Sequence, residues 1–215
     1  MMQKSFFTTP EGAKMGYLLY RQGEKQPGAP LLIYLHGGDG RGDDPDLFYR
    51  IPCLAQFIED GSAVIPEGAV VLSPQCAEGS NWAKEGAVLK ALIDQLIETE
   101  ELDPKRISLT GVSLGGMGTF TMGVAYPAFF SCLMPVCASV DPATCAVLTD
   151  VPVRIFHGTE DHGMGFSVKE AHEVIKAAGG SSELNMLEGH GHEIRWIYQD
   201  RSMGLTEWML ARKRA

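Results

Sequence analysis

The sequence predicts an α/β protein in which a mostly parallel central sheet carries helices on both faces, as a single domain over residues 1–215. Three observations lead to this fold class. Apolar runs of strand-like composition alternate along the chain with segments of helical periodicity. The runs are apolar on both faces, as in the strands of a covered parallel sheet. A chain of 215 residues with 45% hydrophobic residues is long enough to bury one sizeable core.

The expected strands are short runs rich in apolar and β-branched residues, each bounded by Gly, Pro or Asp. In chain order they cover residues 16–20, 31–36, 69–74, 106–112, 132–138, 153–157 and 183–187. In a sheet of this kind ligands bind beyond the carboxyl ends of the strands, so the chemistry is expected in the loops that follow them.

The expected helices lie between most of these runs. The clearest covers residues 87–102, where apolar residues at 88, 89, 92, 93, 96 and 97 repeat with the helical period and Asp103-Pro104 follows as a stop signal. Similar patterns predict helices over residues 48–59, 114–125, 167–178 and 205–213.

Composition limits the class of partner and the compartment. The chain carries 18 Lys and Arg against 27 Asp and Glu, a formal net charge of -9, which argues against nucleic acid and acidic membranes as partners. No window approaches the roughly 18 apolar residues of a spanning helix, and the N-terminal MMQKSFFTTPEG lacks the apolar core of a signal peptide. A cytoplasmic protein is therefore expected. Five cysteines in apolar surroundings favour reduced thiols over a disulfide framework.

Glycines crowd around Ser113 in SLTGVSLGGMGTF, residues 108–120. The string GVSLG at 111–115 matches G-x-S-x-G, a sharp turn that exposes the central serine as a nucleophile. The pattern alone also arises by chance in a glycine-rich chain, but here it stands between an expected strand and an expected helix, the context that the motif requires. Gly116 and Gly118 are expected to bring the helix close to the sheet.

A serine nucleophile needs hydrogen-bond donors for the negative oxygen that forms during attack. The amide of Leu114, directly after the serine, is one expected donor of this oxyanion hole. The second is expected from LHGGDG at 35–40, which follows an expected strand with a bare backbone, and Gly38 is favoured within it. The alternative for this stretch is an ordinary glycine-rich turn.

The acid should follow the serine and precede the histidine along the chain. The stretch HGTED at 157–161 follows an expected strand and places two carboxylates in a loop at the carboxyl edge. Asp161 is the expected acid and Glu160 the second choice. A solvated turn carboxylate is the alternative reading for either residue.

The base is expected in EGHGHE at 188–193. His192 is favoured because it lies deeper in the loop, and His190 remains the alternative. The same two histidines, with Glu188 and Glu193, are the best case for a metal-dependent mechanism, in which a metal-bound water would hydrolyse esters. No H-E-x-x-H motif or further ligand cluster supports it, so neither a metal nor a cofactor is expected.

Five segments carry a resemblance to a known family. They read LLIYLHGGDGRG, VVLSPQCAEGSNW, LDPKRISLTGVSLGGMGTFTMGVAYPAFFSCLMPVCAS, PVRIFHGTED and GHGHEIRWIY. From Pro30 to Trp208 the chain resembles the α/β-hydrolase superfamily, and more narrowly the phospholipase/carboxylesterase or feruloyl-esterase-like group of small bacterial esterases. The third segment is the most specific. Its Asp-Pro-x-Arg-Ile stretch, the G-x-S-x-G turn that follows and the later Tyr126-Pro127 all match the arrangement of that group.

The resemblance implies the three-layer α/β-hydrolase fold and a role for individual residues. By it, the nucleophile, acid and base are Ser113, Asp161 and His192, and the oxyanion hole is made by Gly38 and Leu114. It also implies that Trp82 and Trp196 lie in segments that line the substrate pocket.

These observations predict a serine hydrolase that cleaves a small-molecule carboxylic ester through an acyl-enzyme intermediate. No long insertion separates the strands to form a large lid, so short-acyl or aryl esters are favoured over long lipids. Thioesters and peptides remain open as substrates. The alternative from a different class is a non-catalytic protein that binds a small ligand or partner on the same scaffold.

Overall fold

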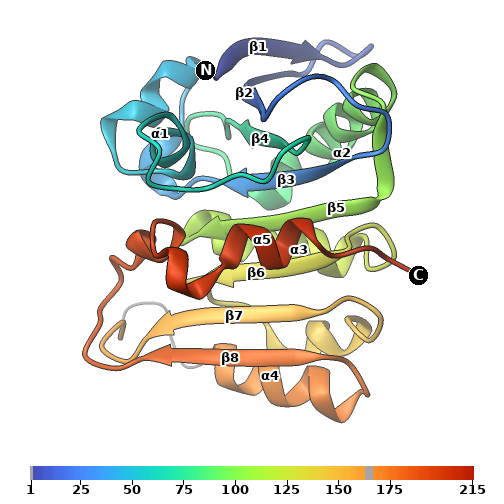
Figure 1. The fold of residues 1–215 in the computed structure, drawn as a ribbon. Coiled ribbons are helices and arrows are strands. Elements are labelled where there is room, and N and C mark those ends of the chain that lie inside the picture. Colours follow the sequence, from blue (N-terminus) through green and yellow to red (C-terminus); the bar gives the residue numbers. More distant parts are fainter. Residues whose placement is uncertain (1, 163–166) are drawn as a thin grey trace.

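The computed structural model describes residues 2–162 and 167–215 and is built around an eight-stranded sheet (Figure 1). Its strands are β1 (Gln3–Thr8), β2 (Lys14–Arg21), β3 (Ala29–Leu35), β4 (Val70–Pro74), β5 (Leu102–Val112), β6 (Cys132–Val136), β7 (Val153–Gly158) and β8 (Ser182–Leu187). They lie side by side in the order β1-β2-β4-β3-β5-β6-β7-β8. β2 pairs antiparallel with β1 and β4, and every other neighbouring pair is parallel. The predicted mostly parallel sheet is confirmed.

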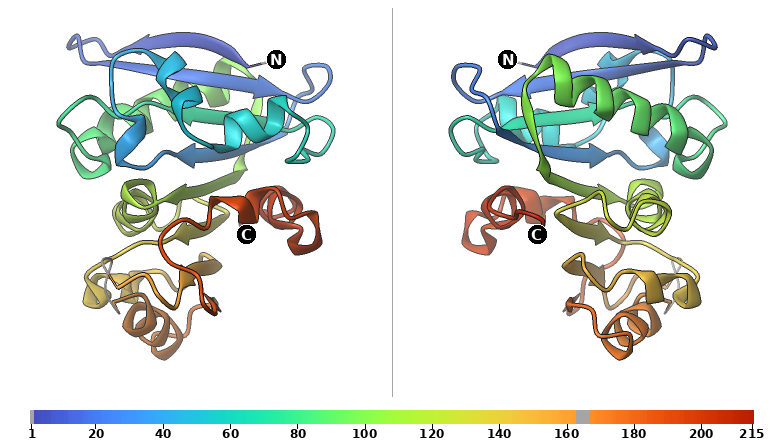
Figure 2. Two further views of the ribbon diagram at one scale, coloured as in Figure 1. Left: turned by 90° about the vertical axis from the view of Figure 1, so that its left-hand side faces the viewer. Right: turned by 90° about the vertical axis from the view of Figure 1, so that its right-hand side faces the viewer.

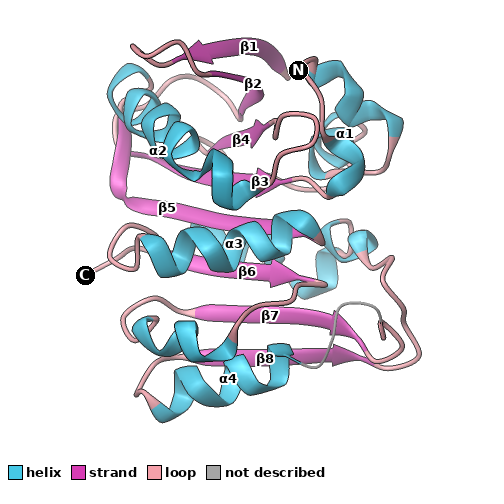
Figure 3. Cartoon of the chain, turned by 180° about the vertical axis from the view of Figure 1, so that it is seen from behind, coloured by secondary structure: helices cyan, strands magenta, loops and turns pink. Residues whose placement is uncertain are grey.

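Helices cover both faces of this sheet. They are α1 (Leu54–Glu59), α2 (Trp82–Thr99), α3 (Leu114–Ala125), α4 (Ser167–Ala177) and α5 (Leu205–Leu210), with short 3-10 helices η1 (Gly38–Gly40), η2 (Pro45–Arg50), η3 (Pro142–Val147), η4 (Arg195–Tyr198) and η5 (Arg201–Met203). α1 and α5 lie in front of the sheet in Figure 1, and α2, α3 and α4 lie in front of it when it is seen from behind in Figure 3. The views from either side in Figure 2 show the sheet between these two layers.

The core follows from this layering, because each face of the sheet buries its own set of apolar side chains. One buried cluster joins the sheet to α2, α3 and α4 through residues such as Leu92, Phe120 and Ile175. The other joins it to α1 and α5 through residues such as Leu54 and Met209. The predicted three-layer α/β fold is therefore confirmed. None of the described helices has both the length and the apolar character needed to cross a membrane.

Three predicted helices need correction, and one strand was missed. β1 was not predicted, because most of this edge strand is exposed and it shows no clear apolar run. The helix predicted over 48–59 is divided into η2 and α1, since Pro52 forces Ile51 into an extended conformation. The helix predicted over 87–102 begins earlier, at Trp82, because the Asn81 side chain accepts a hydrogen bond from the Lys84 amide, and it ends at Thr99. The final helix ends at Leu210, short of the predicted residue 213.

Candidate active site

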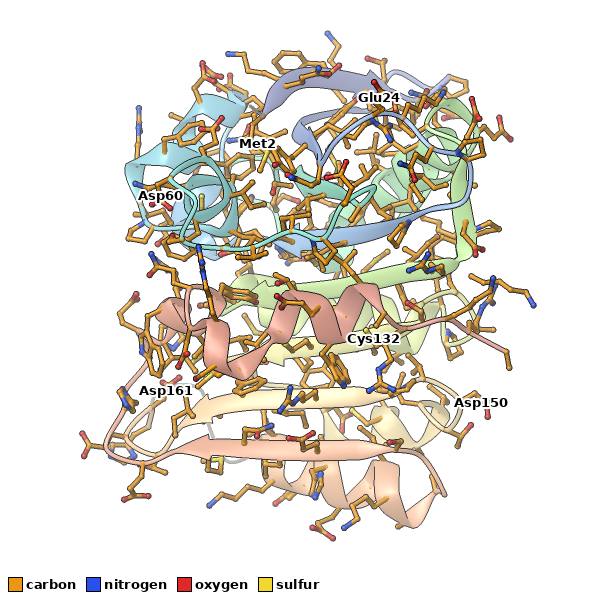
Figure 4. All side chains as sticks on the ribbon, in the orientation of Figure 1. Met2, Glu24, Asp60, Cys132, Asp150 and Asp161 are labelled. Atoms are coloured by element: carbon orange, nitrogen blue, oxygen red, sulfur yellow. The ribbon has the colours of Figure 1, made fainter. Side chains whose placement is uncertain are left out.

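The carboxyl ends of the parallel strands meet at one edge of the sheet, and the candidate residues follow four of those ends. Gly38 comes after β3, Ser113 directly after β5, Asp161 after β7 and His192 after β8. Figure 4 shows Asp161 at this edge, beside the end of β7. Residues that are far apart in the sequence are thus brought to the same edge, as expected for an open α/β sheet.

Ser113 stands at a strained turn between β5 and α3. Its backbone angles are φ 59 and ψ -116, a region that non-glycine residues rarely occupy. Its amide donates a hydrogen bond to the Val136 carbonyl on β6 at 2.9 Å, which fixes the turn against the neighbouring strand. The side chain is partly exposed. The turn therefore has the geometry that the G-x-S-x-G motif predicts.

The glycines around Ser113 make room for backbone as well as for side chains. A Cβ atom on Gly111 would lie 2.5 Å from the Gly115 carbonyl oxygen, and one on Gly115 would lie 1.9 Å from the Leu35 carbonyl oxygen. Gly116 brings α3 close to the sheet as predicted, since a Cβ there would lie 2.4 Å from the carbonyl oxygen of Val136. The expectation for Gly118 was wrong, because this glycine faces the Trp82 side chain of α2 instead of the sheet.

We expect Gly115→Ala to lower the free energy of unfolding by about 3 kcal/mol, because the new methyl group meets rigid backbone that cannot move aside. Urea denaturation of the natural chain and the variant measures this difference. Gly191→Ala is the control, since a Cβ there has no atom within 4 Å, and its effect should stay within about 0.5 kcal/mol. Equal unfolding midpoints for Gly115→Ala and the natural chain would refute the close-approach explanation.

His192 and Asp161 are in direct contact. His192 Nδ1 lies 2.7 Å from Asp161 Oδ2, the Asp161 side chain is buried, and the imidazole is about one-third exposed. An Nδ1–H that donates to the carboxylate leaves Nε2 without a proton and able to accept one. This is the arrangement that a general base oriented by an acid requires.

The hydroxyl of Ser113 does not extend this hydrogen bond between His192 and Asp161 to a third residue. Within the described part of the molecule it has no hydrogen-bond partner, so His192 is joined to Asp161 but Ser113 is not joined to His192. In proteins without substrate this contact is often longer than in the complex.

The second histidine of the loop makes different contacts. The His190 ring packs against Trp196, with centroids 5.2 Å apart, and the His190 carbonyl accepts a hydrogen bond from the Glu160 amide at 2.9 Å. His190 therefore supports the loop that carries Asp161 through its backbone. The predicted acid and the favoured histidine meet, and the alternative histidine lies against an aromatic ring.

The two expected oxyanion donors begin helices. Leu114 is the first residue of α3 and Gly38 the first residue of η1, positions where the helix itself offers no carbonyl to the amide. Gly38 is exposed and Leu114 partly exposed, so a ligand can reach both. The Leu114 amide suits an anionic oxygen because it lies at the positive end of the α3 dipole.

The buried His36 holds the loop that carries Gly38. Its Nδ1 donates to the Gly37 carbonyl at 2.5 Å, and its Nε2 accepts a hydrogen bond from the Cys76 amide at 2.9 Å. A Cβ on Gly40 would lie 2.5 Å from Cγ of the His36 ring, so the loop wraps closely around the imidazole. Burial lowers the pKa of His36 to about 4, which keeps the ring neutral and its Nε2 able to accept.

This histidine should make folding sensitive to acid. The pKa of His36 is about 4 in the folded chain and near 6.5 when unfolded, so between these values the unfolded chain binds the proton more readily. Stability should be full above pH 6.5 and should fall by about 3 kcal/mol as the pH drops toward 4. The free energy of unfolding measured against pH should fall less steeply in His36→Gln. An identical slope in both chains would contradict this prediction.

An ion pair that the sequence reasoning missed connects two loops at this edge. Arg195 Nη2 lies 2.9 Å from Asp39 Oδ2 and Nη1 lies 3.5 Å from Glu193 Oε2, with the Arg195 side chain largely buried. Arg195 lies shortly after His192, and Asp39 lies next to Gly38. The pair therefore fixes the loop of the candidate base against the loop of a candidate oxyanion donor. No short motif joins these residues, so only the tertiary structure reveals their contact.

The two tryptophans lie in different settings. Trp82 is buried, and its Nε1 donates to the His36 carbonyl at 3.2 Å, which ties the start of α2 to the loop after β3. It also lines a surface hollow of about 230 Å³ together with Leu114 and Met117. Trp196 is partly buried, and its ring packs against that of His190 with an angle of 44° between the ring planes. Both rings thus lie close to candidate site residues.

Two further side chains approach Asp161. His157 Nε2 lies 3.8 Å from Asp161 Oδ2, and both residues are buried. Cys137, which follows β6 with a left-handed φ of 46, is fully buried. Burial and the neighbouring Asp161 raise the pKa of the Cys137 thiol to about 12, so without another ligand it is protonated. The sequence analysis assigned neither residue to the site.

Comparison with known proteins places this geometry in a family context. The family model described as Phospholipase/Carboxylesterase matches residues 80–199, a stretch that includes Ser113, Asp161 and His192. Among curated proteins, the chain is 28% identical over 169 residues to the bifunctional acetylxylan esterase/xylanase XynS20E of Neocallimastix patriciarum. The match covers 74% of this chain but 23% of that much longer protein.

Solved structures show the same fold. A thermostable esterase has a TM-score of 0.82 and 23% sequence identity, over 99% of this chain and 63% of that one. The feruloyl esterase module of Clostridium thermocellum, in a mutant complexed with sinapinate, has a TM-score of 0.72 and 13% identity, over 100% of this chain and 89% of that one. At these identities the likeness establishes the fold.

Proposed function

Because the chain belongs to the phospholipase/carboxylesterase family of α/β-hydrolases, we propose that it is a serine esterase that works through an acyl-enzyme intermediate. The observation that carries this proposal is the 2.7 Å contact between His192 Nδ1 and Asp161 Oδ2. The strained turn at Ser113 on the same edge of the sheet supports it. We further propose that residues 1–215 act as one domain.

In the proposed reaction, Ser113 Oγ attacks the ester carbonyl carbon while His192 Nε2 accepts the hydroxyl proton. Asp161 keeps the imidazole oriented and stabilises its positive charge, and the amides of Leu114 and Gly38 donate to the oxyanion. As the tetrahedral intermediate collapses, the bond to the alcohol oxygen breaks and His192 returns the proton to the leaving alcohol. Water then attacks the acyl-enzyme with His192 as base, which releases the carboxylic acid and restores Ser113.

The proposed substrates are small esters with a short acyl chain or an aryl group. The hollow of about 230 Å³ beside Leu114 supports this, since its volume lies below the usual range of about 300–1,000 Å³ for ligand pockets. Trp82 lines that hollow, and Trp196 lies beside the loop of His192, so both are proposed to contact substrate. The names of two similar proteins suggest acetyl esters of xylan and feruloyl esters, whose acyl groups are a short chain and an aryl-bearing group.

A series of p-nitrophenyl esters tests both the activity and this substrate class. We expect kcat/KM for the acetate and butyrate to exceed that for the laurate by about tenfold or more, because one misplaced methylene already costs roughly 1–3 kcal/mol in a shaped pocket. Initial rates at matched ester concentrations measure the ratio. Faster cleavage of the laurate would overturn the preference, and no cleavage of any ester would count against the esterase itself.

A further inference from the structure

A cluster of metal-binding side chains lies behind the candidate triad. Cys137, His157 and Asp161 each offer one ligand atom, and these atoms lie within 4.8 Å of one another. The three residues come from two neighbouring strand ends, since Cys137 follows β6 while His157 lies in β7 and Asp161 in the loop after it. All three are buried. This group differs from the His190/His192 pair that the sequence suggested as the metal alternative.

The chemistry of the cluster matches a thiophilic divalent cation. Zinc binds thiolate, imidazole and carboxylate ligands, and tetrahedral bonds of about 2.0–2.3 Å space these ligand atoms roughly 3.3–3.8 Å apart. The one ligand distance known within the cluster, His157 Nε2 to Asp161 Oδ2, is 3.8 Å. The other two pairs lie within 4.8 Å, so the ligand atoms would need to approach one another by about 1 Å or less to enclose an ion.

One further observation supports a ligand at this place. A small hollow of about 50 Å³, lined by His157 and Asp161, adjoins the cluster and is large enough for a water molecule as a further ligand. The negative charges of Asp161 and Glu193 act on Cys137 and favour a cation, whereas the positive charge of Lys169 acts on His157 and opposes one.

We propose that Cys137, His157 and Asp161 bind Zn²⁺ or a similar thiophilic divalent cation, and that this binding inhibits the esterase. The ion replaces the thiol proton of Cys137, which passes to solvent. Its positive charge then opposes the negative charge of Asp161, on which the protonated form of His192 depends during ester cleavage. The inhibitory effect rests on the proposed function, whereas the binding does not.

Cadmium binding to the metal-free Ser113→Ala chain tests the site without any need for activity. Cd²⁺ forms an ultraviolet charge-transfer band with a thiolate, so we expect this band to saturate at one ion per chain. The band should be lost in the additional variants Cys137→Ala and Cys137→Ser, and His157→Gln should weaken binding by at least about tenfold. Cys132→Ala is the matched control, because Cys132 is equally buried at the opposite end of β6, and its band should be unchanged.

Circular dichroism checks the folding of each variant. Two replacements are made at Cys137, so that the test remains possible if one of the variants does not fold. No band in excess Cd²⁺, or a band that survives in folded Cys137 variants, would overturn the site. In the active chain, Zn²⁺ should lower the rate of p-nitrophenyl acetate cleavage at least about tenfold, and a chelator should restore it. Cadmium binding combined with zinc-insensitive cleavage would overturn the inhibition alone. If the natural chain cleaves no ester but the cadmium band appears, the esterase proposal fails while the metal site stands.

Discussion

Ser113→Ala is expected to lower kcat for ester cleavage by about a millionfold, the size of effect seen when the serine of a triad that acts as a unit is removed. Without Oγ no acyl-enzyme can form, and only binding and oxyanion stabilisation remain to assist water. The alanine keeps the strained turn, because it adds no atom to the serine side chain. Stopped assays with p-nitrophenyl acetate, continued for long enough to detect the residual rate, measure the loss.

The control for this prediction is the stability of the Ser113→Ala chain, which shows whether lost activity comes from unfolding. The urea midpoint of Ser113→Ala should match that of the natural chain, since the Ser113 side chain has no hydrogen-bond partner within the described residues. A folded Ser113→Ala chain that keeps a tenth or more of the natural kcat, where about 10⁻⁶ is expected, would remove Ser113 from the mechanism.

The second large effect is expected at His192. His192→Ala should lower kcat by about a millionfold as well, because a triad histidine acts as a unit with its serine. His190→Ala is the matched control from the same loop, and it should change kcat by less than about tenfold, because its ring contacts Trp196 and its carbonyl remains in place. Parallel kinetics of the two variants decide between the histidines. If His190→Ala is the inactive one, the assignment of the base must be exchanged.

Much of the fold could be predicted from the chain because its signals are local. The predicted strands and the helix after Ser113 lie close to the observed ones, because apolar periodicity and the G-x-S-x-G motif depend on residues that are near in sequence. β1 escaped detection because an edge strand needs no apolar face. The helix predicted over 48–59 is divided because Pro52 holds Ile51 in an extended conformation, although the apolar spacing on either side of it is helical.

The candidate site was predicted in part for the same reason. Ser113, Asp161 and His192 each follow a strand that can be recognised, so the rule that chemistry lies at the carboxyl edge was sufficient to place them at one edge of the sheet, where Asp161 and His192 are in contact. Contacts between loops were beyond this rule. The Arg195–Asp39 ion pair joins residues 156 positions apart, and it depends on loop conformations that no local pattern specifies.

The surroundings of Asp161 were missed for a related physical reason. Cys137 follows β6 in a left-handed conformation that is uncommon for a residue with a side chain, so its thiol reaches Asp161 only in the folded protein. His157 lies in an apolar strand, a position typical of a packed core histidine, so the sequence does not single it out. The order of β6 and β7 in the sheet sets both residues beside the carboxylate.

Covalent labelling with a fluorophosphonate probe shows whether Ser113 is an activated nucleophile. We expect one adduct per chain, located by mass spectrometry on the peptide that contains Ser113. Labelling should be abolished in Ser113→Ala and strongly reduced in His192→Ala. Unchanged labelling of Ser113→Ala, or a natural chain that takes up no probe, would rule out Ser113 as the nucleophile. If that unlabelled chain still cleaved esters and a chelator stopped it, a metal-bound water would replace the serine as nucleophile.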